Sequence, residues 1–321
     1  MTHILADRHH AGLTNSLILL FEKRLGYTLK FQKGLEWYTE GYWNVYPHID
    51  TAKQYLEREV EGLKGITLEE FKNTEFDILI ASLPQHIDPF RRLIELYQPN
   101  AKLIFQVGNQ WDPHHFLVKN IMASAKLPPL TGLNTIEYHQ EFDLNTFHYG
   151  QPKLSKNMYS FINCLNTADL FKKDWEFFLQ LEKLMPDWNF RSYGGQCRDG
   201  YYNSTTEIAD KMREAFFVFH LKSGGDGYGH NLWNTAFVGR PMITRLSDYQ
   251  GKLGEVLFSD GETCLTIDDK DPYEISKLLN MIYEDYSIYE DMCQKIYKRA
   301  TENCNFEKEA REIETFILNL I

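Results

Sequence analysis

A glycine-rich segment at residues 223–229, Ser-Gly-Gly-Asp-Gly-Tyr-Gly, carries the clearest chemical signal in the sequence. It holds four glycines and one acid, Asp226, between an apolar run at 216–221 and a second apolar run that ends in Gly-Arg-Pro. Backbone N–H groups at the start of a helix lack partners inside the helix, and the helix dipole adds partial positive charge there. Glycines let an anion approach those groups closely. The segment therefore favours a diphosphate site over a turn that needs only positive φ angles.

The glycine-rich segment differs from two well-known phosphate-binding patterns. It lacks the Gly-Lys-Ser/Thr of a P-loop, and its glycine spacing and late position do not match the dinucleotide-binding fingerprint. Lys222 directly precedes the segment. It is a candidate for neutralising a phosphate and equally a candidate for a solvated surface charge.

Length, charge and cysteine content exclude several classes of protein. A chain of 321 residues is longer than single hydrophobic cores usually grow, which predicts two domains. The sequence has neither an apolar run long enough to span a bilayer nor a secretory signal, which predicts a cytoplasmic protein without a membrane span. Five cysteines without a Cys-x-x-Cys pair favour reduced thiols over a disulfide framework or a zinc site. A formal net charge of −11 disfavours a large nucleic-acid-binding surface.

Hydrophobic patterning predicts strands that alternate with helices in both halves of the chain. The expected strands are 3–7, 27–31, 76–81, 101–107, 158–164, 188–193 and 216–221. The expected helices are 13–25, 89–97, 170–184, 205–215, one from Asp271 to about residue 300, and 306–320. A capping box is expected at Thr67. This alternation is typical of parallel sheets with crossover helices. The pattern weakens between 125 and 156, which places a domain boundary near residue 153.

The segment from Asp226 to Ile243 resembles the EGFGLxxLEAMAxGxPVI signature of glycosyltransferases with the GT-B fold. The continuation at 254–279, GEVLFSDGETCLTIDDKDPYEISKLL, is similar to the family's EVVxDGxTGLLVxxxDPxxLAxAL. The resemblance implies an α/β protein of two Rossmann-like domains, with parallel sheets that face a central cleft. It implies an acceptor-side domain at 1–153, a nucleotide-sugar-binding domain at 154–304, and a C-terminal helix at 305–321 that crosses back to the first domain.

The resemblance also assigns roles in donor binding. Asp226 stands where the family contacts the donor sugar, and Asn234 stands where a glutamate binds the donor ribose. Lys172 or Lys173 is the candidate for a phosphate-binding lysine, whereas the family's arginine would fall near Cys164 and is missing. A histidine that many members carry would fall near 108–109 and is missing too. The full donor-binding set expected is Lys172, Lys173, Gly194, Lys222, Gly225, Gly227, Tyr228, Gly229, His230 and Asn234.

The acceptor side is expected near the first strand, because enzymes of this fold meet the acceptor there. His10 is the candidate general base toward an acceptor hydroxyl, with Asp7 as its orienting partner or as the base itself. A histidine pair satisfied by caps and solvent is the alternative, and His9 is expected to point elsewhere. The aromatic side chains of Trp37, Tyr42 and Trp43 are candidates for stacking on an acceptor. Packing beneath a long loop is an equally good interpretation of them.

Together these features predict a glycosyltransferase that moves a sugar from a nucleoside diphosphate sugar, with UDP as the favoured nucleotide, to an acceptor hydroxyl. The resemblance favours retention of anomeric configuration, and inversion stays open. No metal and no cofactor are expected beyond the donor substrate. The acceptor class is open among glycans, small molecules, proteins and modified DNA bases. Two alternatives are a non-catalytic protein that binds nucleotide sugars or glycans, and a transferase that glycosylates hydroxymethylated DNA bases or a protein.

Overall fold

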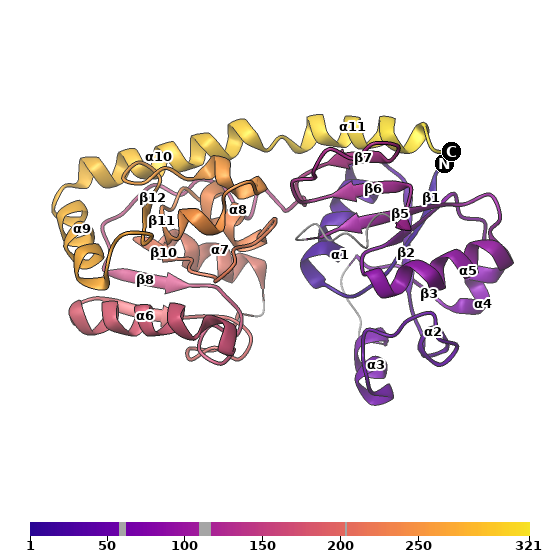
Figure 1. Cartoon of the computed structure of the whole chain (residues 1–321), viewed down its shortest axis with the longest axis horizontal. Helices are drawn as coiled ribbons and strands as arrows, with labels where there is room; N and C mark the ends of the chain where they lie inside the picture. The colour runs from indigo at the N-terminus through magenta and orange to yellow at the C-terminus, as the bar shows by residue number, and fades with distance from the viewer. Residues whose placement is uncertain (58–61, 109–116, 203) are drawn as a thin grey trace. The chain divides into compact units, whose positions relative to one another are not determined.

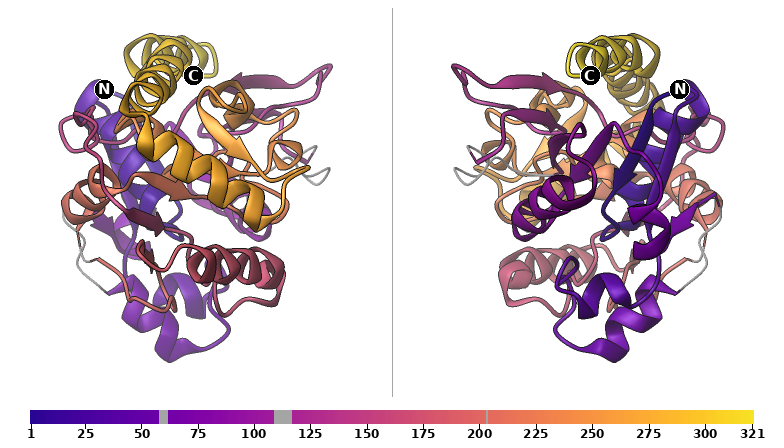
Figure 2. Two further views of the ribbon diagram at one scale, coloured as in Figure 1. Left: turned by 90° about the vertical axis from the view of Figure 1, so that its left-hand side faces the viewer. Right: turned by 90° about the vertical axis from the view of Figure 1, so that its right-hand side faces the viewer.

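A computed structural model describes residues 1–57, 62–108, 117–202 and 204–321 (Figure 1). The chain divides into two units, one of residues 1–142 with 306–321 and one of residues 143–305. The boundary between the units lies at residues 142–143 rather than at the predicted position of 153, so residues 143–153 belong to the second unit. Residues 306–321 belong with the first. In each unit, parallel strands lie side by side with helices packed against them (Figures 1 and 2).

The first unit is built on a seven-stranded parallel sheet with the order β3-β2-β1-β4-β5-β6-β7. Its strands are β1 (His3–Ala6), β2 (Thr28–Gln32), β3 (Gly65–Ile66), β4 (Ile78–Ala81), β5 (Lys102–Val107), β6 (Asn120–Ala123) and β7 (Asn134–Glu137). Its α-helices are α1 (Ala11–Leu17), α2 (Glu36–Thr39), α3 (Ile49–Leu56), α4 (Leu68–Lys72), α5 (Ile87–Tyr97) and α11 (Phe306–Leu318). A π-helix, η1 (Ile18–Arg24), continues α1, and a 3-10 turn, η2 (Pro84–His86), precedes α5.

Alternation along β1 shows how the first sheet builds two cores. Ile4 and Ala6 join one buried cluster with side chains of α1, η1 and α11. Leu5 points to the opposite face and joins a second cluster with side chains of α3, α4 and α5. Successive side chains of a strand point to opposite faces, so both faces of this sheet are covered by helices.

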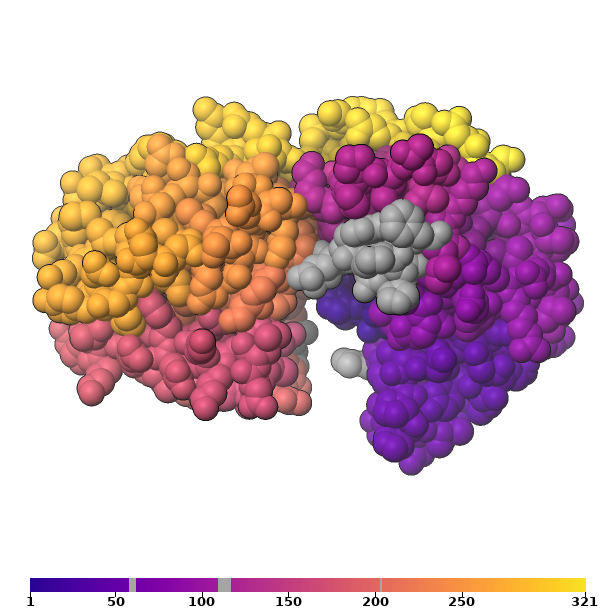
Figure 3. Space-filling view, in the orientation of Figure 1, coloured from indigo at the N-terminus to yellow at the C-terminus, as the bar shows by residue number. Residues whose placement is uncertain are grey.

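The second unit is built on a five-stranded parallel sheet with the order β12-β11-β10-β8-β9. Its strands are β8 (Asn157–Ser160), β9 (Asn189–Ser192), β10 (Phe217–Phe219), β11 (Met242–Thr244) and β12 (Cys264–Thr266). Its α-helices are α6 (Lys172–Leu184), α7 (Thr205–Glu214), α8 (His230–Phe237), α9 (Pro272–Glu284) and α10 (Tyr286–Asn303). Short 3-10 turns are η4 (Asp169–Phe171), η5 (Leu246–Asp248) and η6 (Leu253–Leu257). In the space-filling view α6 forms the lower edge of this unit (Figure 3).

The structure confirms most predicted elements and corrects one of them. Gly26 ends the first helix with a φ of +68°, and Thr67 forms its capping box with Glu70. The single helix expected from Asp271 to about 300 is instead two helices, α9 and α10. Asp285 separates them with an extended backbone, and its carboxylate accepts a hydrogen bond from the Ser287 N–H at 3.0 Å. The strands β3, β6, β7, β11 and β12 and the helices α2 and α3 are not among the predicted elements, and β7 lies in the weakly patterned region.

Among the helices of the described ranges, none is both long enough and apolar enough to cross a bilayer.

The C-terminal helix α11 is held to the first unit by apolar packing and by charge. Ile313 is 1% exposed and packs in the cluster beneath α1 and η1. His139 Nδ1 lies 2.8 Å from a Glu309 carboxylate oxygen, and the His139 N–H donates to the other oxygen at 2.7 Å. Arg24 bonds Glu307 on α11. This helix is therefore part of the first unit's core.

Ile313→Ala is expected to lower the free energy of unfolding of the full chain by about 2–5 kcal/mol, because it removes a buried side chain and leaves a cavity. Denaturant unfolding followed by circular dichroism measures the change. Glu312→Ala, at an exposed position on the same helix, is the matched control and is expected to cost far less. Equal losses in the two variants would show that α11 is not packed as described.

Candidate functional site

The glycine-rich segment joins a strand to a helix, as predicted. β10 ends at Phe219 and α8 begins at His230, so residues 220–229 form the connecting loop. Gly229 is the N-cap of α8, with a φ of +73° and no side-chain hydrogen bond to the helix. The end of the loop therefore forms the N-terminus of a helix, where the partial positive charge of the helix dipole favours an anion.

Two glycines of the loop are required by the protein's own packing. Gly225 has a φ of +60°, and a Cβ there would collide with the Asp248 carbonyl oxygen. A Cβ on Gly229 would stand 2.9 Å from the Asp226 side chain. These positions therefore need glycine before any ligand is considered.

Asp226 is a buried carboxylate between two basic side chains. It is 5% exposed, the Lys222 ammonium donates to its Oδ1, and His220 Nε2 lies 3.5 Å from its Oδ2. Burial raises the pKa of Asp226, but the hydrogen bond and charge of His220 and the charge of Lys222 outweigh burial and lower the pKa to about 2. The group is therefore ionised throughout the neutral range and acts as a hydrogen-bond acceptor.

A second carboxylate, Asp174, fixes the start of the loop and was missed in the sequence. It is fully buried in the first turn of α6. Its Oδ2 accepts from the Ser223 backbone N–H at 2.8 Å and from the Ser223 hydroxyl at 2.7 Å, and Arg245 donates to its Oδ1 at 3.2 Å. An acid in the first turn of a helix was the available signal, but its partners lie far away in sequence.

The loop after β11 closes the other side of the glycine-rich segment. Arg245 donates to Asp248 at 2.8 Å, and Asp248 accepts from the Gly224 N–H at 3.3 Å. Lys252 donates to the Gly224 carbonyl oxygen. Three cations and three carboxylates therefore lie on this loop or contact it: Lys222, Arg245, Lys252, Asp174, Asp226 and Asp248.

Asn234 combines burial with an unsatisfied polar atom. It lies on α8, is 7% exposed, and its Oδ1 has no hydrogen-bond partner within the described part of the chain. Buried polar atoms are nearly always hydrogen-bonded, because losing water without a partner costs free energy. The Asn234 oxygen is therefore a ready acceptor for a hydroxyl group from outside the chain.

The remaining donor-side candidates are placed as follows. Lys172 and Lys173 are exposed in the first turn of α6, next to Asp174, which bonds Ser223. Gly194 has a φ of +147°, and a Cβ there would stand 2.8 Å from the Asn163 side-chain oxygen, so its packing requires glycine.

Tyr228 and His230, the other two side chains of the donor set, contact each other. Tyr228 is 1% exposed and stacks on Trp233. It meets His230 edge-on, with 5.3 Å between the Tyr228 and His230 ring centroids. Its side chain is therefore a packing group, and only its backbone is suited to a ligand.

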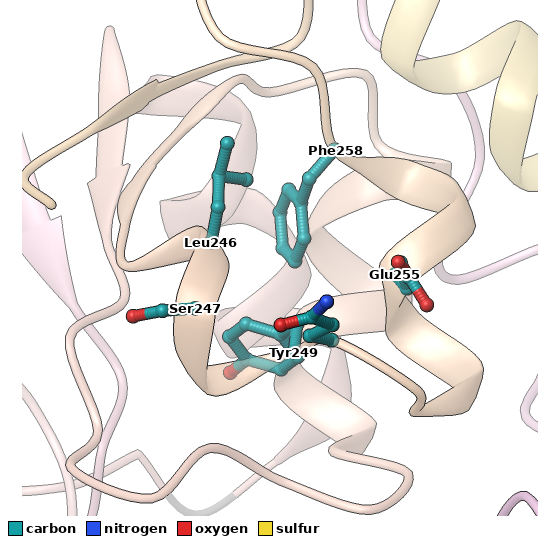
Figure 4. A pocket seen from close by; sticks show the side chains of 6 residues that line it. Leu246, Ser247, Tyr249, Glu255 and Phe258 are labelled. Atoms are coloured by element: carbon teal, nitrogen blue, oxygen red, sulfur yellow. The ribbon is translucent and has the colours of Figure 1, made fainter.

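A shallow pocket of about 250 Å³ lies on the loops after β11 (Figure 4). Its lining residues are Leu246, Ser247, Tyr249, Gln250, Glu255 and Phe258. None of the predicted donor residues lines this pocket. Burial, with the charge of Asp226, raises the pKa of Tyr249. The phenol is therefore neutral.

The aromatic candidates on the acceptor side are core residues. Trp37 and Trp43 are fully buried, Tyr42 is 5% exposed, and all three belong to one hydrophobic cluster. The Trp37 indole N–H donates to the Ile66 carbonyl at 3.0 Å. Their rings are therefore closed to an acceptor in this structure, and packing beneath the loop is the interpretation that the structure supports.

Asp7 and His10 lie near each other in sequence but have different environments. Asp7 is 2% exposed, and its carboxylate accepts from the Ser82 N–H at 2.6 Å and contacts His86 Nδ1 at 2.7 Å. Burial opposes its charge, yet the hydrogen bond to His86 and the proximity of the His86 and His9 rings hold the pKa of Asp7 well below its usual range. His10 is exposed and caps α1, since its Nδ1 accepts from the Leu13 N–H at 3.3 Å. Asn109, at the expected histidine position, lies outside the described residues.

No family model and no curated protein matches the sequence. Solved structures do match the fold. HepE of Anabaena in complex with UDP-glucose has a TM-score of 0.69 at 10% identity, over 99% of this chain and 100% of that one. An α-glucosyltransferase in complex with UDP-glucose and DNA containing an abasic site has a TM-score of 0.67 at 10% identity, over 99% of each chain. Sucrose-phosphate synthase from Thermosynechococcus elongatus has a TM-score of 0.62 at 10% identity, over 100% of this chain and 99% of that one. The chain therefore has the GT-B fold that the sequence predicted.

The low pKa of Asp226 makes a prediction about acid stability. Its folded pKa of about 2 lies below the ordinary value of 3.8, so its stabilising contribution of about 2 kcal/mol is present above about pH 4 and is lost as the pH falls toward 2. Urea unfolding at a series of acid pH values is expected to show a shallower pH dependence for Asp226→Asn than for the natural chain. Asp187→Asn, at an exposed position, is the control. An unchanged slope for Asp226→Asn would contradict the ion-pair geometry.

Proposed function

We propose that this protein transfers a sugar from a nucleoside diphosphate sugar to an acceptor hydroxyl. The observation that carries the proposal is the unsatisfied Asn234 oxygen on α8. The glycine-rich loop, with the ionised Asp226, lies at the N-terminus of the same helix. Such a site suits a ligand with both hydroxyl groups and a diphosphate. The fold supports the same conclusion, since the solved structures named above include glycosyltransferases holding UDP-glucose.

Each side chain has a proposed role in donor binding. Asp226 accepts hydrogen bonds from sugar hydroxyls, and Asn234 accepts one from the ribose. Backbone N–H groups between Gly227 and His230, with Lys222 and Lys172 or Lys173, stabilise the negative charge of the diphosphate. This charge grows as the bond between the anomeric carbon and the phosphate oxygen breaks and its electron pair leaves with the diphosphate. Hydrogen-bond donors and cations that are already positioned for this developing charge lower the activation barrier of the transfer.

The finer proposals follow the resemblance. The donor base is uracil, the sugar a hexose, the anomeric configuration retained, and the reaction independent of a metal ion or cofactor. Lys222 and the helix N-terminus supply the positive charge that a metal would otherwise provide. Asp7 is proposed to serve the acceptor side, and the cytoplasm is the proposed location. Proton NMR of the first-formed product tests retention, and activity after EDTA treatment tests metal independence.

A non-catalytic nucleotide-sugar-binding protein is the second candidate, favoured by Asn234 in place of a carboxylate and by the missing arginine near Cys164. Incubation with UDP-glucose, with release of UDP as the readout, distinguishes the two candidates. A transferase is expected to hydrolyse the donor slowly in the absence of an acceptor. Tight UDP-glucose binding with no hydrolysis and no transfer to any acceptor would favour the binding protein.

Asp226→Ala is expected to abolish UDP release from UDP-glucose, because the variant loses the carboxylate that holds the sugar. Lys308→Ala, at an exposed position on α11, is the control and is expected to keep full turnover. Circular dichroism establishes that both variants are folded. A folded Asp226→Ala protein with normal turnover would remove Asp226 from the site.

The role of Asn234 is tested by pairing a change in the protein with a change in the ligand. The natural chain is expected to bind UDP more tightly than 2′-deoxy-UDP, and Asn234→Ala is expected to lose about tenfold in UDP affinity and most of that preference. Isothermal titration calorimetry measures all four affinities. Asn319→Ala, an exposed asparagine, is the control. A variant that keeps the preference for UDP would place the ribose elsewhere.

A further inference from the structure

A polar cluster in the first unit lies at the carboxyl ends of β1 and β4. Asp7 follows β1 and Ser82 follows β4. These two strands are neighbours at the point where the order of the sheet reverses, with β2 and β3 on one side and β5, β6 and β7 on the other. Open parallel sheets bind ligands at such a point, outside the carboxyl ends of the strands. The cluster therefore occupies a position suited to a second ligand.

The two oxygens of the Asp7 carboxylate differ in their partners. Oδ2 is satisfied by the Ser82 N–H and by His86. Oδ1 is buried and has no hydrogen bond within the described residues, and His9 Nδ1 lies 3.7 Å from it. A buried carboxylate oxygen without a partner costs free energy. A small movement of the His9 ring would supply an Nδ1–H bond to it.

Three histidines lie near this carboxylate, and their nitrogens are used differently. His86 is fully buried and stacks on Trp43 with 4.6 Å between ring centroids, so its Nε2 is closed to a ligand. His10 uses the lone pair of Nδ1 to cap α1, which places the proton of its neutral ring on Nε2. A neutral His10 therefore has no lone pair left to accept a hydroxyl proton.

His9 has the complementary arrangement. Its side chain is 17% exposed while its Nδ1 is buried facing Asp7, so the exposed part of the ring lies away from Nδ1. With the proton on Nδ1 directed at the carboxylate, the lone pair is on Nε2. Among these three histidines, His9 is thus the one suited to accept a hydrogen bond from a ligand.

We propose that His9 and Asp7 form a hydroxyl-binding site in the first unit, in which His9 Nε2 accepts a hydrogen bond from a hydroxyl group of the sugar acceptor. Asp7 is a positioning residue that sets the tautomer and orientation of the His9 ring, and the Ser82 N–H and His86 hold Asp7 in place. This inference rests on the proposed function for the identity of the ligand. It replaces His10 with His9 as the histidine that meets the acceptor.

The other charged and titratable groups around the cluster fit this assignment. The Arg8 guanidinium donates a hydrogen bond to the Leu56 carbonyl oxygen at 3.2 Å, and its Cζ lies 5.1 Å from the centroid of the Tyr55 ring. Burial raises the pKa of Tyr55, so this phenol is neutral. Asp7 is therefore the negatively charged group facing His9 among the side chains named here.

The tautomer is tested directly by long-range ¹H–¹⁵N NMR of the ¹⁵N-histidine-labelled full chain at about pH 8, where imidazoles are mostly neutral. Single His9→Gln, His10→Gln and His86→Gln variants assign the signals. The expected result is an unprotonated Nε2 for His9 and an unprotonated Nδ1 for His10. A His9 ring with its proton on Nε2 would overturn the proposal. The tautomers are read from the natural chain, and the variants serve only to assign its signals.

Asp7→Asn tests the positioning role. The amide lacks the charge that fixes the Nδ1–H tautomer, so the His9 signals are expected to move toward an average of both tautomers. The His10 signals are expected to stay unchanged, since the cap of α1 sets them. A His9 ring that keeps its tautomer in folded Asp7→Asn protein would overturn the role of Asp7.

Methyl α-glucoside is the ligand probe, with UDP present at saturation. It is expected to shift the His9 Nε2 signal of the natural chain. His9→Gln, whose amide keeps a hydrogen-bonding group, is expected to weaken the probe's binding severalfold, and His9→Ala more, while UDP affinity by calorimetry is unchanged in both. Normal UDP binding with an unshifted His9 signal would overturn the hydroxyl site alone. Failure of the natural chain to bind UDP would instead contradict the proposed function.

Discussion

The candidate donor site depends on the hydrogen bonds that the buried Asp174 carboxylate accepts. This carboxylate fastens the start of the glycine-rich loop to the first turn of α6 through both polar groups of Ser223, and it receives Arg245 from the loop after β11. Removing one partner from a buried charged network leaves the others without compensation, which costs several kcal/mol. The two oxygens of Asp174 thus hold together α6, the glycine-rich loop and the loop after β11, which are far apart in sequence. Asp226 lies three residues after Ser223, so its position depends on these contacts.

The glycines of the loop illustrate how one residue type serves two needs. Gly225 and Gly229 are demanded by contacts with Asp248 and Asp226, as well as by their positive φ angles. In the proposed function, the same absence of side chains lets a diphosphate approach the backbone near the start of α8. Packing and ligand access therefore impose the same residue, and a glycine pattern alone does not separate the two. The unsatisfied Asn234 oxygen is a feature of α8 that packing leaves unexplained.

Both sheets place polar side chains at the carboxyl ends of their strands. Asp7 follows β1 in the first unit, and the glycine-rich loop follows β10 in the second. In a parallel sheet all strands end at the same edge, so residues distant in sequence meet there. In the proposed function, the nucleotide sugar binds at the edge that carries the glycine-rich loop, and the hydroxyl group binds at the edge that carries Asp7.

The sequence by itself determined the alternation of strands and helices and the strand–loop–helix context of Asp226, because these depend on local periodicity and on glycine chemistry. The GT-B fold followed from the resemblance of residues 226–243 and 254–279 to a known family's signature. The sequence did not predict β6 and β7, because each is a run of only four residues that becomes a strand by pairing, β6 with β5 and β7 with β6. Only the tertiary structure decided that Trp37 and its neighbours are core, that Asp174 anchors the loop, and that His9 faces Asp7 while His10 caps α1. The physical reason is that burial and long-range hydrogen bonds are properties of folded neighbours, which residue order does not specify.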